Sequence, residues 1–213
     1  KIDALGNVLA VRKAARAGAP RVMLTAHMDE VGFMLVGEDG NGLYRFETVG
    51  GMDMRQLVGK RVIVGREHTP GVIGARPIHL TTTEERRRLI PLDALRIDLG
   101  PEGKASLGDR AVFDTRFQRS GPALIARALD NRLGVVLLIE LLRHAPQNIE
   151  MLAAFTTQEE IGGRGARVAA FHFDPDMAVV IDSTPAHDLP TWDDEESTFY
   201  NTRLGLGPAV YVG

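Results

Sequence analysis

Three short apolar stretches of this chain each end in side chains of the types that bind divalent metal ions. The stretches are RVMLTAHMDE with His27 and Asp29, MLAAFTTQEE with Glu159 and Glu160, and MAVVIDST with Asp182. Short runs rich in Val, Leu, Ile and Met are typical of buried strands in a mostly parallel sheet. Ligands of open α/β sheets bind outside the carboxyl ends of the strands. The pattern therefore predicts an α/β fold with a metal site at one edge of its sheet.

The composition narrows the kind of protein and the kind of metal site. The 213 residues carry a net charge of -3, so there is no basic surplus of the kind that favours nucleic acid or a membrane surface. The longest apolar stretch, residues 133–142, is too short to span a bilayer. We expect a soluble, cytoplasmic protein. Because the chain has no cysteine, any metal must be held by histidine and carboxylate side chains.

Strands and helices alternate along the two outer parts of the sequence. We expect strands at residues 3–11, 21–26, 149–157 and 177–182, and helices at 130–143 and 163–171. The helix at 130–143 is nearly continuously apolar, which predicts that it is buried, and Asp130 or Asn131 can cap its start.

Residues 31–121 have a different sequence pattern, in which short stretches of Val, Ile and Leu lie between glycines. One or two helical turns around TTTEERRRL are the only plausible helix there. The region is far too long for a strand-to-helix connection, which usually takes about 2–6 residues. We therefore expect a β-rich domain at 34–121, inserted between catalytic segments 1–33 and 122–213. The chain starts on Lys1 and closes on the apparent strand GPAVYVG, so we also expect it to be truncated at both ends.

Two of the candidate ligands have ordinary structural explanations when each is taken alone. His27 follows an apolar strand, where a lone histidine is more often structural, but a neutral imidazole there can also bind a metal while Asp29 orients it. Asp130, in ALDNRLG, can be a helix cap, or a carboxylate that bridges two cations.

The adjacent carboxylates of Glu159 and Glu160 are harder to explain without a cation. They repel each other at the end of a buried strand unless a metal ion or a proton relieves them. In a metal site, one of them can bind the ion while its neighbour acts as general base. The alternative is a solvated turn, and Asp182 has a similar alternative as a turn residue. Taken together, these side chains favour a metal site.

A set of motifs in this order resembles one known family along nearly the whole chain. The motifs are LGNVLA, LTAHMDEVGFML, VGGMD, GVIGARPIHL, GDRAVFD, RALDNRLG, FTTQEEIGGRGA and VVIDSTPAHDLP. They resemble the TET-type glutamyl aminopeptidase family of dinuclear metallopeptidases, some of whose members are labelled endoglucanase or FrvX. The resemblance implies a phosphorylase/hydrolase-like α/β catalytic domain. It also implies a PDZ-like or small-barrel insertion, which makes dimer contacts that build up to a dodecamer.

The resemblance also implies a role for each candidate residue. One metal would be held by His27, Asp130 and Asp182. A second would share Asp130 and bind Glu160, with Glu159 as general base and Asp29 steering His27. The ions would be zinc or cobalt and the substrates peptides. The family's second metal takes a further histidine near the end of a longer chain, so we expect these 213 residues alone to have little or no activity. Two other functions remain as alternatives to an aminopeptidase: a related metal-dependent deacylase, and a non-enzymatic assembly protein that keeps the fold.

Overall fold

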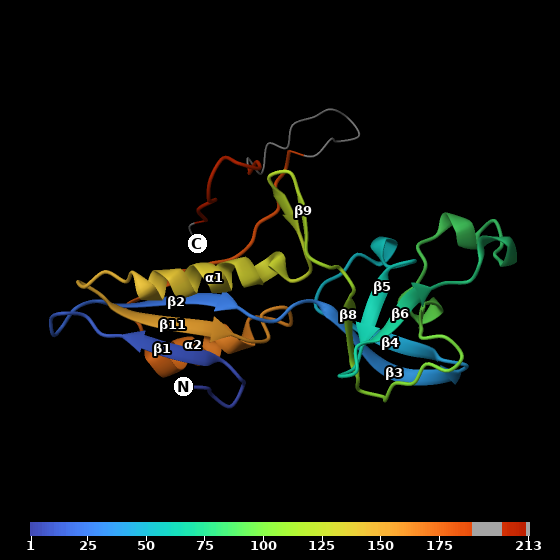
Figure 1. The fold of residues 1–213 in the computed structure, drawn as a ribbon, viewed down its shortest axis with the longest axis horizontal. Coiled ribbons are helices and arrows are strands. Elements are labelled where there is room, and N and C mark those ends of the chain that lie inside the picture. The colour runs from blue at the N-terminus through green and yellow to red at the C-terminus, as the bar shows by residue number, and fades with distance from the viewer. Residues whose placement is uncertain (189–201, 212–213) are drawn as a thin grey trace.

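The structure is a computed structural model, and it describes residues 1–188 and 202–211. The chain forms an α/β part and a barrel, which lie side by side along the long axis of the molecule (Figure 1). The barrel lies in the sequence between the second strand and the first helix of the α/β part. None of the helices among the described residues is long and apolar enough to cross a membrane, and the cytoplasmic location stays a prediction.

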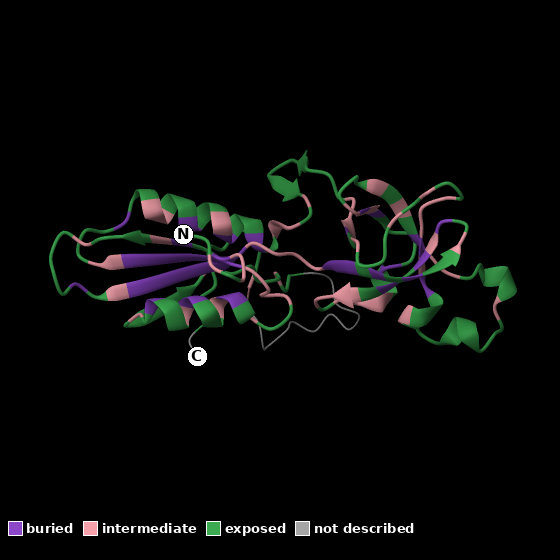
Figure 2. Cartoon of the chain, turned by 90° about the horizontal axis from the view of Figure 1, so that it is seen from below, coloured by how far each residue is buried: buried purple, intermediate pink, exposed green. Residues whose placement is uncertain are grey.

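The α/β part is a four-stranded sheet between two helices. Its strands lie in the order β1 (Val8–Arg12), β11 (Glu150–Thr156), β2 (Arg21–His27) and β12 (Met177–Val180). Strand β2 is parallel to both of its neighbours, and only β1 is antiparallel to β11. Helix α1 (Leu129–Arg143) covers one face and α2 (Arg164–Phe173) the other (Figure 2). The mostly parallel α/β sheet expected from the sequence is confirmed.

Alternate residues of the two central strands fill the apolar layers on the two faces, as the period of two of a strand requires. The layer under α1 contains Val22, Leu24 and Ala26 of β2, together with Met151, Ala153, Phe155 and Leu138. The layer under α2 contains Met23 of β2, together with Leu9, Leu152, Ala154, Ala169 and Phe173. The central strands are therefore held from both sides, and their carboxyl ends are fixed in position.

The barrel is closed by six strands in the order β3-β4-β7-β6-β5-β8. Their bounds are Gly32–Gly40 (β3), Leu43–Val49 (β4), Arg61–Val64 (β5), Thr69–Gly74 (β6), Arg96–Asp98 (β7) and Arg110–Phe113 (β8). A closed barrel is the second of the two forms expected for this region. The domain division at residues 34 and 121 stays a prediction.

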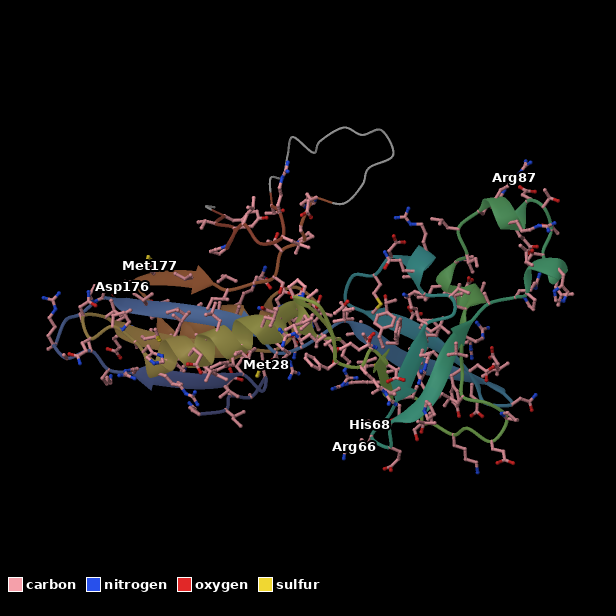
Figure 3. The ribbon with its side chains drawn as sticks, turned by 45° about the horizontal axis from the view of Figure 1, so that its top comes forward. Met28, Arg66, His68, Arg87, Asp176 and Met177 are labelled. Atoms are coloured by element: carbon pink, nitrogen blue, oxygen red, sulfur yellow. The ribbon has the colours of Figure 1, made fainter. Side chains whose placement is uncertain are left out.

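Short 3-10 helices connect the barrel strands, and a short hairpin follows the barrel in the sequence. Four 3-10 helices are η1 (Met54–Gln56), η2 (Ile78–Leu80), η3 (Glu85–Arg87) and η4 (Leu92–Ala94). The segment between β6 and β7 projects from the barrel, with Arg87 at its outer end (Figure 3). The helical turn expected around TTTEERRRL is η3. After the barrel, β9 (Gln118–Ser120) and β10 (Ala123–Ile125) form a separate hairpin.

The first strand is shorter than predicted. Residues 3–7 form a turn instead of the start of a strand at Asp3, because the Asp3 carboxylate accepts hydrogen bonds from the backbone N–H groups of Leu5 and Asn7. The strand then begins at Val8. A short side chain that bonds its own backbone competes in this way with strand pairing.

Two expectations of burial and one further strand are wrong. Helix α1 buries only one face, and Leu133, Val136 and Leu137 on the other are at least half exposed. Strand β12 was expected to be buried but is exposed at every residue, since it pairs only with β2. Residues 207–211 of the expected strand GPAVYVG form no strand, and its last two residues lie outside the described ones. Apolar composition predicts a strand or helix that can be buried, not which of its faces is covered.

Candidate metal centre

His27 is the buried centre of a group of carboxylates. It is the last residue of β2, and its side chain is 3% exposed. Its Nε2 atom lies 3.2 Å from Asp130 Oδ1, 3.5 Å from Asp182 Oδ1 and 3.9 Å from Glu159 Oε2. Asp130 is at the start of α1, and Asp182 and Glu159 follow β12 and β11. Separate elements thus bring their polar ends to one point at the carboxyl edge of the sheet.

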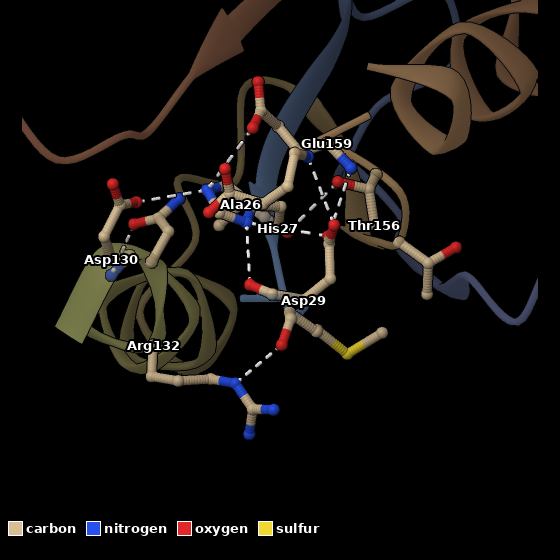
Figure 4. A network of polar contacts seen from close by, with 12 residues as sticks. Ala26, His27, Asp29, Asp130, Arg132, Thr156 and Glu159 are labelled. Carbon is tan, nitrogen blue, oxygen red and sulfur yellow. Dashed lines mark hydrogen bonds and ion pairs between the residues drawn. The ribbon is translucent and has the colours of Figure 1, made fainter. Parts of the chain in front are cut away.

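The other imidazole nitrogen is held by Asp29 (Figure 4). His27 Nδ1 lies 3.1 Å from the main-chain oxygen of Asp29 and 3.6 Å from its carboxylate. The sequence predicts that Asp29 steers His27, and the closer of its two contacts with the imidazole is through its main-chain carbonyl. An imidazole whose Nδ1–H donates to a carbonyl leaves the Nε2 lone pair free for a metal.

The carboxylate of Asp29 instead holds the turn that carries the two glutamates. It accepts the backbone N–H of Glu159 at 3.1 Å and that of Glu160 at 3.2 Å. One residue therefore fixes both His27 and the Glu159–Glu160 turn. The sequence could not predict the hydrogen bonds from these two amides to Asp29, because the bonded residues are separated by 130 and 131 positions in the chain.

Two sets of three side chains have ligand atoms close enough together to surround a cation. His27 with Asp130 and Asp182 is one set, and His27 with Glu159 and Glu160 is the other, each with its atoms within 4.8 Å of one another. Bonds of about 2.0–2.2 Å from zinc to nitrogen or oxygen fit into such spaces after small side-chain movements. A single nitrogen lone pair binds one ion, so only a carboxylate can bridge two. The donor set therefore fits divalent metal ions.

The environment of Glu160 also favours a cation. Burial raises the pKa of its carboxyl group above the ordinary value, and the negative charge of Asp130 adds to this effect. A carboxylate in such surroundings is stabilised by a positive ion that replaces the lost water and offsets the neighbouring charge.

Two buried asparagines hold the backbone on either side of the cluster. Asn131, 1% exposed, donates from Nδ2 to the carbonyl of Ile181 at 2.7 Å, and its Oδ1 accepts the N–H of Gly134. It thereby caps the regular part of α1, as the sequence suggested for Asn131, and fixes the residue before Asp182. Sequence reasoning missed this second contact.

Asn7, which is fully buried, has the same role on the glutamate side. Its Nδ2 donates to Asp3 and to the carbonyl of Gly165, while its Oδ1 accepts the N–H of Thr157. Thr157 lies two residues before Glu159, so Asn7 fixes the end of β11 to the start of α2. Both N–H groups of the Asn7 amide and its oxygen are used, and the Thr157 hydroxyl, which lies 3.0 Å from the carbonyl of Leu5, is also 3.3 Å from Oδ1.

The remaining histidines of the described chain lie outside both sets of ligand atoms. His68 is in the turn between β5 and β6 of the barrel (Figure 3). His187 lies in the segment after β12, where its backbone N–H donates to Thr202. As ligands and catalytic groups, the residues around His27 stay predictions.

Carboxylates and an imidazole at the carboxyl ends of strands in an α/β sheet are typical of metal-dependent hydrolases. The chain belongs to the M42 glutamyl aminopeptidase family, whose sequence model matches residues 6–213. A putative aminopeptidase of Acetivibrio thermocellus is 34% identical over 219 residues, which cover 100% of this chain and 62% of that protein. The chain thus spans less than two thirds of the length of this relative.

Solved structures agree with this assignment. An aminopeptidase from the archaeon Desulfurococcus kamchatkensis superposes with a TM-score of 0.87 at 34% identity, covering 98% of this chain and 59% of its own. The TET1 peptidase of Pyrococcus horikoshii, which can assemble into a tetrahedron or a large octahedral shell, gives 0.74 at 36% identity over 89% of this chain and 62% of its own.

Proposed function

We propose that the protein is an aminopeptidase that removes N-terminal residues from peptides with the help of two divalent metal ions. The observation that carries this proposal is the convergence of Asp130, Asp182 and Glu159 on Nε2 of the buried His27. Aminopeptidases of the same family support it. Bound cations would polarise the scissile carbonyl and make water a stronger nucleophile at neutral pH.

The side chains divide the work according to their positions. His27, Asp130 and Asp182 would hold one ion, and Asp130 and Glu160 would hold the other. Zinc or cobalt suits this donor set, because imidazole and carboxylate discriminate weakly between them. Asp29 keeps the imidazole and the Glu159–Glu160 turn in register.

Glu159 is the general base in this proposal. Its side chain is 42% exposed, so it can reach both water and substrate. Its carboxylate takes a proton from the attacking water as the carbon–oxygen bond forms. It then gives that proton to the leaving nitrogen as the peptide carbon–nitrogen bond breaks. The products are a free amino acid and a shortened peptide.

The same proposal extends to assembly. The barrel region, 34–121 as expected from the sequence, supplies contacts between copies of the chain, in line with the tetrahedral and octahedral assemblies of the TET1 peptidase. A dimer that builds up to a dodecamer is the proposed state. The barrel can offer its outer surface to another subunit without changing the strands that carry the metal ligands.

Substitution of the base and a comparison of substrates test the function. In the complete gene product, Glu159→Gln should retain its metal ions and lower turnover of aminoacyl anilides by about 10²-fold or more. Glu150→Gln, at the first residue of β11 and away from the turn that carries Glu159, is the matched control and should be fully active. Faster hydrolysis of N-acyl substrates than of free aminoacyl anilides would identify a deacylase instead. Equal loss of metal in Glu159→Gln and Glu160→Gln would show that the two roles are assigned wrongly.

A further inference from the structure

The barrel reaches back to the candidate metal centre at one point. Only residues 28–31 separate the end of β2, at His27, from the start of β3, at Gly32. Gly32 is paired with Val49, the last residue of β4. The residue after Val49 is Gly50, which the antiparallel pairing therefore returns to the side of the β2–β3 link.

Gly50 lies against the turn that carries Glu160. A Cβ atom on Gly50 would be 2.8 Å from Cγ1 of Val31 and 3.3 Å from Cβ of Glu160. The first distance is shorter than real Cβ contacts, and the second requires Glu160 to move by a few tenths of an ångström. Gly50 also has φ of +91°, a conformation that other residues adopt only with strain. Both the space and the backbone thus require glycine.

The turn at Glu160 is therefore supported from two sides. The Asp29 carboxylate holds its backbone N–H at 3.2 Å, and the barrel residue Gly50 lies against its Cβ. The ligands of the other set, Asp130 and Asp182, come from α1 and from the segment after β12, which belong to the α/β part. The barrel contact at Gly50 thus acts on one of the two sets of ligands.

We propose that Gly50 is a positioning residue through which the barrel sets the place of the Glu160 carboxylate, and with it the affinity of the second metal ion. This inference rests on the proposed dinuclear function. Barrel and metal centre are coupled through the packing of Gly50 against side-chain carbons of Val31 and Glu160, not through a charged group. A methyl group at position 50 displaces Glu160 from its place beside His27 and leaves the ion held by Asp130 and Asp182 nearly unchanged.

Metal titration of the complete gene product tests the coupling without measuring turnover. Gly50→Ala should lower the affinity of one of the two zinc or cobalt sites by about 10-fold, the size typical of changes to groups that orient metal ligands. The absorption spectrum of bound cobalt should change for that site alone. Val31→Ala removes the methyl group nearest to the added Cβ, so the double variant Val31→Ala/Gly50→Ala keeps, of the two closest contacts, only the one at 3.3 Å with Cβ of Glu160 and should still lower the affinity of the same site.

The barrel offers a matched pair of controls. Gly59 has φ of +81° with nothing within 4 Å of its added Cβ, and its neighbour Val58 is 46% exposed. Gly59→Ala therefore has the same backbone strain as Gly50→Ala without the contact, and Val58→Ala loses the same methyl groups as Val31→Ala. Both controls should bind two ions with wild-type affinity.

The outcomes separate this inference from the proposed function. If the wild-type protein binds no second ion, both the proposed dinuclear function and the role of Gly50 are overturned. Two ions in the wild type, with affinities in Gly50→Ala equal to those in Gly59→Ala, overturn only the role of Gly50. If Gly50→Ala does not fold, the double variant Val31→Ala/Gly50→Ala decides, and affinities in it equal to those in Gly59→Ala overturn the proposal.

Discussion

The two parts of the molecule differ in what they bury. Eleven buried apolar residues, among them Phe33, Tyr44 and Ile97, form one continuous core inside the barrel. The five buried side chains of asparagine, threonine and histidine in the described residues all lie in the α/β part: Asn7, Thr25, His27, Asn131 and Thr156. Apolar packing dominates the barrel core, where the buried Tyr44 exchanges hydrogen bonds with the backbone of Ala105. The α/β part combines apolar packing with several buried polar side chains.

This difference fits the tasks proposed for the two parts. A group of carboxylates around an imidazole must be held to within fractions of an ångström, and directional hydrogen bonds do that better than apolar contacts. Buried polar groups carry a cost if any partner is lost. We therefore expect substitutions in the apolar core of the barrel, away from Gly50, to change stability alone. Substitutions of the buried asparagines should change stability and metal binding together.

The largest expected effect is on the barrel core. Ile97 is fully buried between Tyr44 of β4 and Ile73 of β6. Ile97→Ala should lower the free energy of unfolding by about 2–5 kcal/mol, because it leaves a cavity in a closed core. Urea unfolding measures the loss, and metal titration of the folded variant should give wild-type affinities.

Ile78→Ala is the matched control for this prediction. Ile78 is in the same region of the chain but 68% exposed, so the same substitution should change stability by less than about 0.5 kcal/mol. A loss of metal affinity in folded Ile97→Ala would contradict the division between the two parts.

A smaller effect on stability, joined to an effect on metal binding, is expected at Asn131. Asn131→Ala leaves the carbonyl of Ile181 and the N–H of Gly134 without their partner, which should cost about 1–3 kcal/mol. Since Asn131 follows Asp130 and its partner precedes Asp182, the ion between them should bind about 10-fold more weakly.

Asn148→Ala, at an exposed asparagine between α1 and β11, is the control for Asn131→Ala. It should match the wild type in both unfolding and metal titration. Wild-type metal affinity in Asn131→Ala, beside the expected loss of stability, would reduce Asn131 to a helix cap and weaken the contrast between the two parts.

The sheet and the meeting of the candidate ligands at its carboxyl edge could be predicted from the sequence. The buried side chains that hold those ligands in place could not. Apolar runs ending in His27, Glu159 and Asp182 are a local signal, and parallel pairing makes their ends meet. The hydrogen bond from Thr157 to Asn7 joins residues 150 positions apart, and its partner is chosen by the fold. A buried asparagine looks the same in the sequence as one in a turn.

The sequence also did not predict which apolar residues of α1 and β12 are exposed to solvent. The apolar residues of α1 and β12 have the composition of buried elements, yet Leu133 and Val180 are exposed in the described chain. Composition reports what a segment can bury, and the neighbours that cover it depend on topology. The closed barrel was easier to predict as a β-rich region because its strands alternate over short, glycine-bounded stretches.

The smallest expected effect concerns Asp3, which supports Asn7 from the surface of the α/β part. Burial alone would raise the pKa of the Asp3 carboxyl, but the hydrogen bonds from Asn7 and Leu5 outweigh it and hold the pKa below its ordinary value. A pKa lowered by folding means that the ionised group stabilises the native state, and that this contribution is lost as pH falls through the lowered pKa.

Asp3→Asn places an amide –NH₂ opposite Nδ2 of Asn7. Near pH 6 this variant should therefore be less stable than the wild type by about 1 kcal/mol at most, since Asp3 is partly solvated. Unfolding in urea at a series of pH values should show this difference shrinking as pH falls below the ordinary pKa of aspartate. Asp93→Asn, at an exposed carboxylate of the barrel region, should stay within about 0.5 kcal/mol of the wild type throughout. A constant difference between Asp3→Asn and the wild type would mean that shape, not charge, holds Asn7, and that polar support in the α/β part begins at the buried asparagine itself.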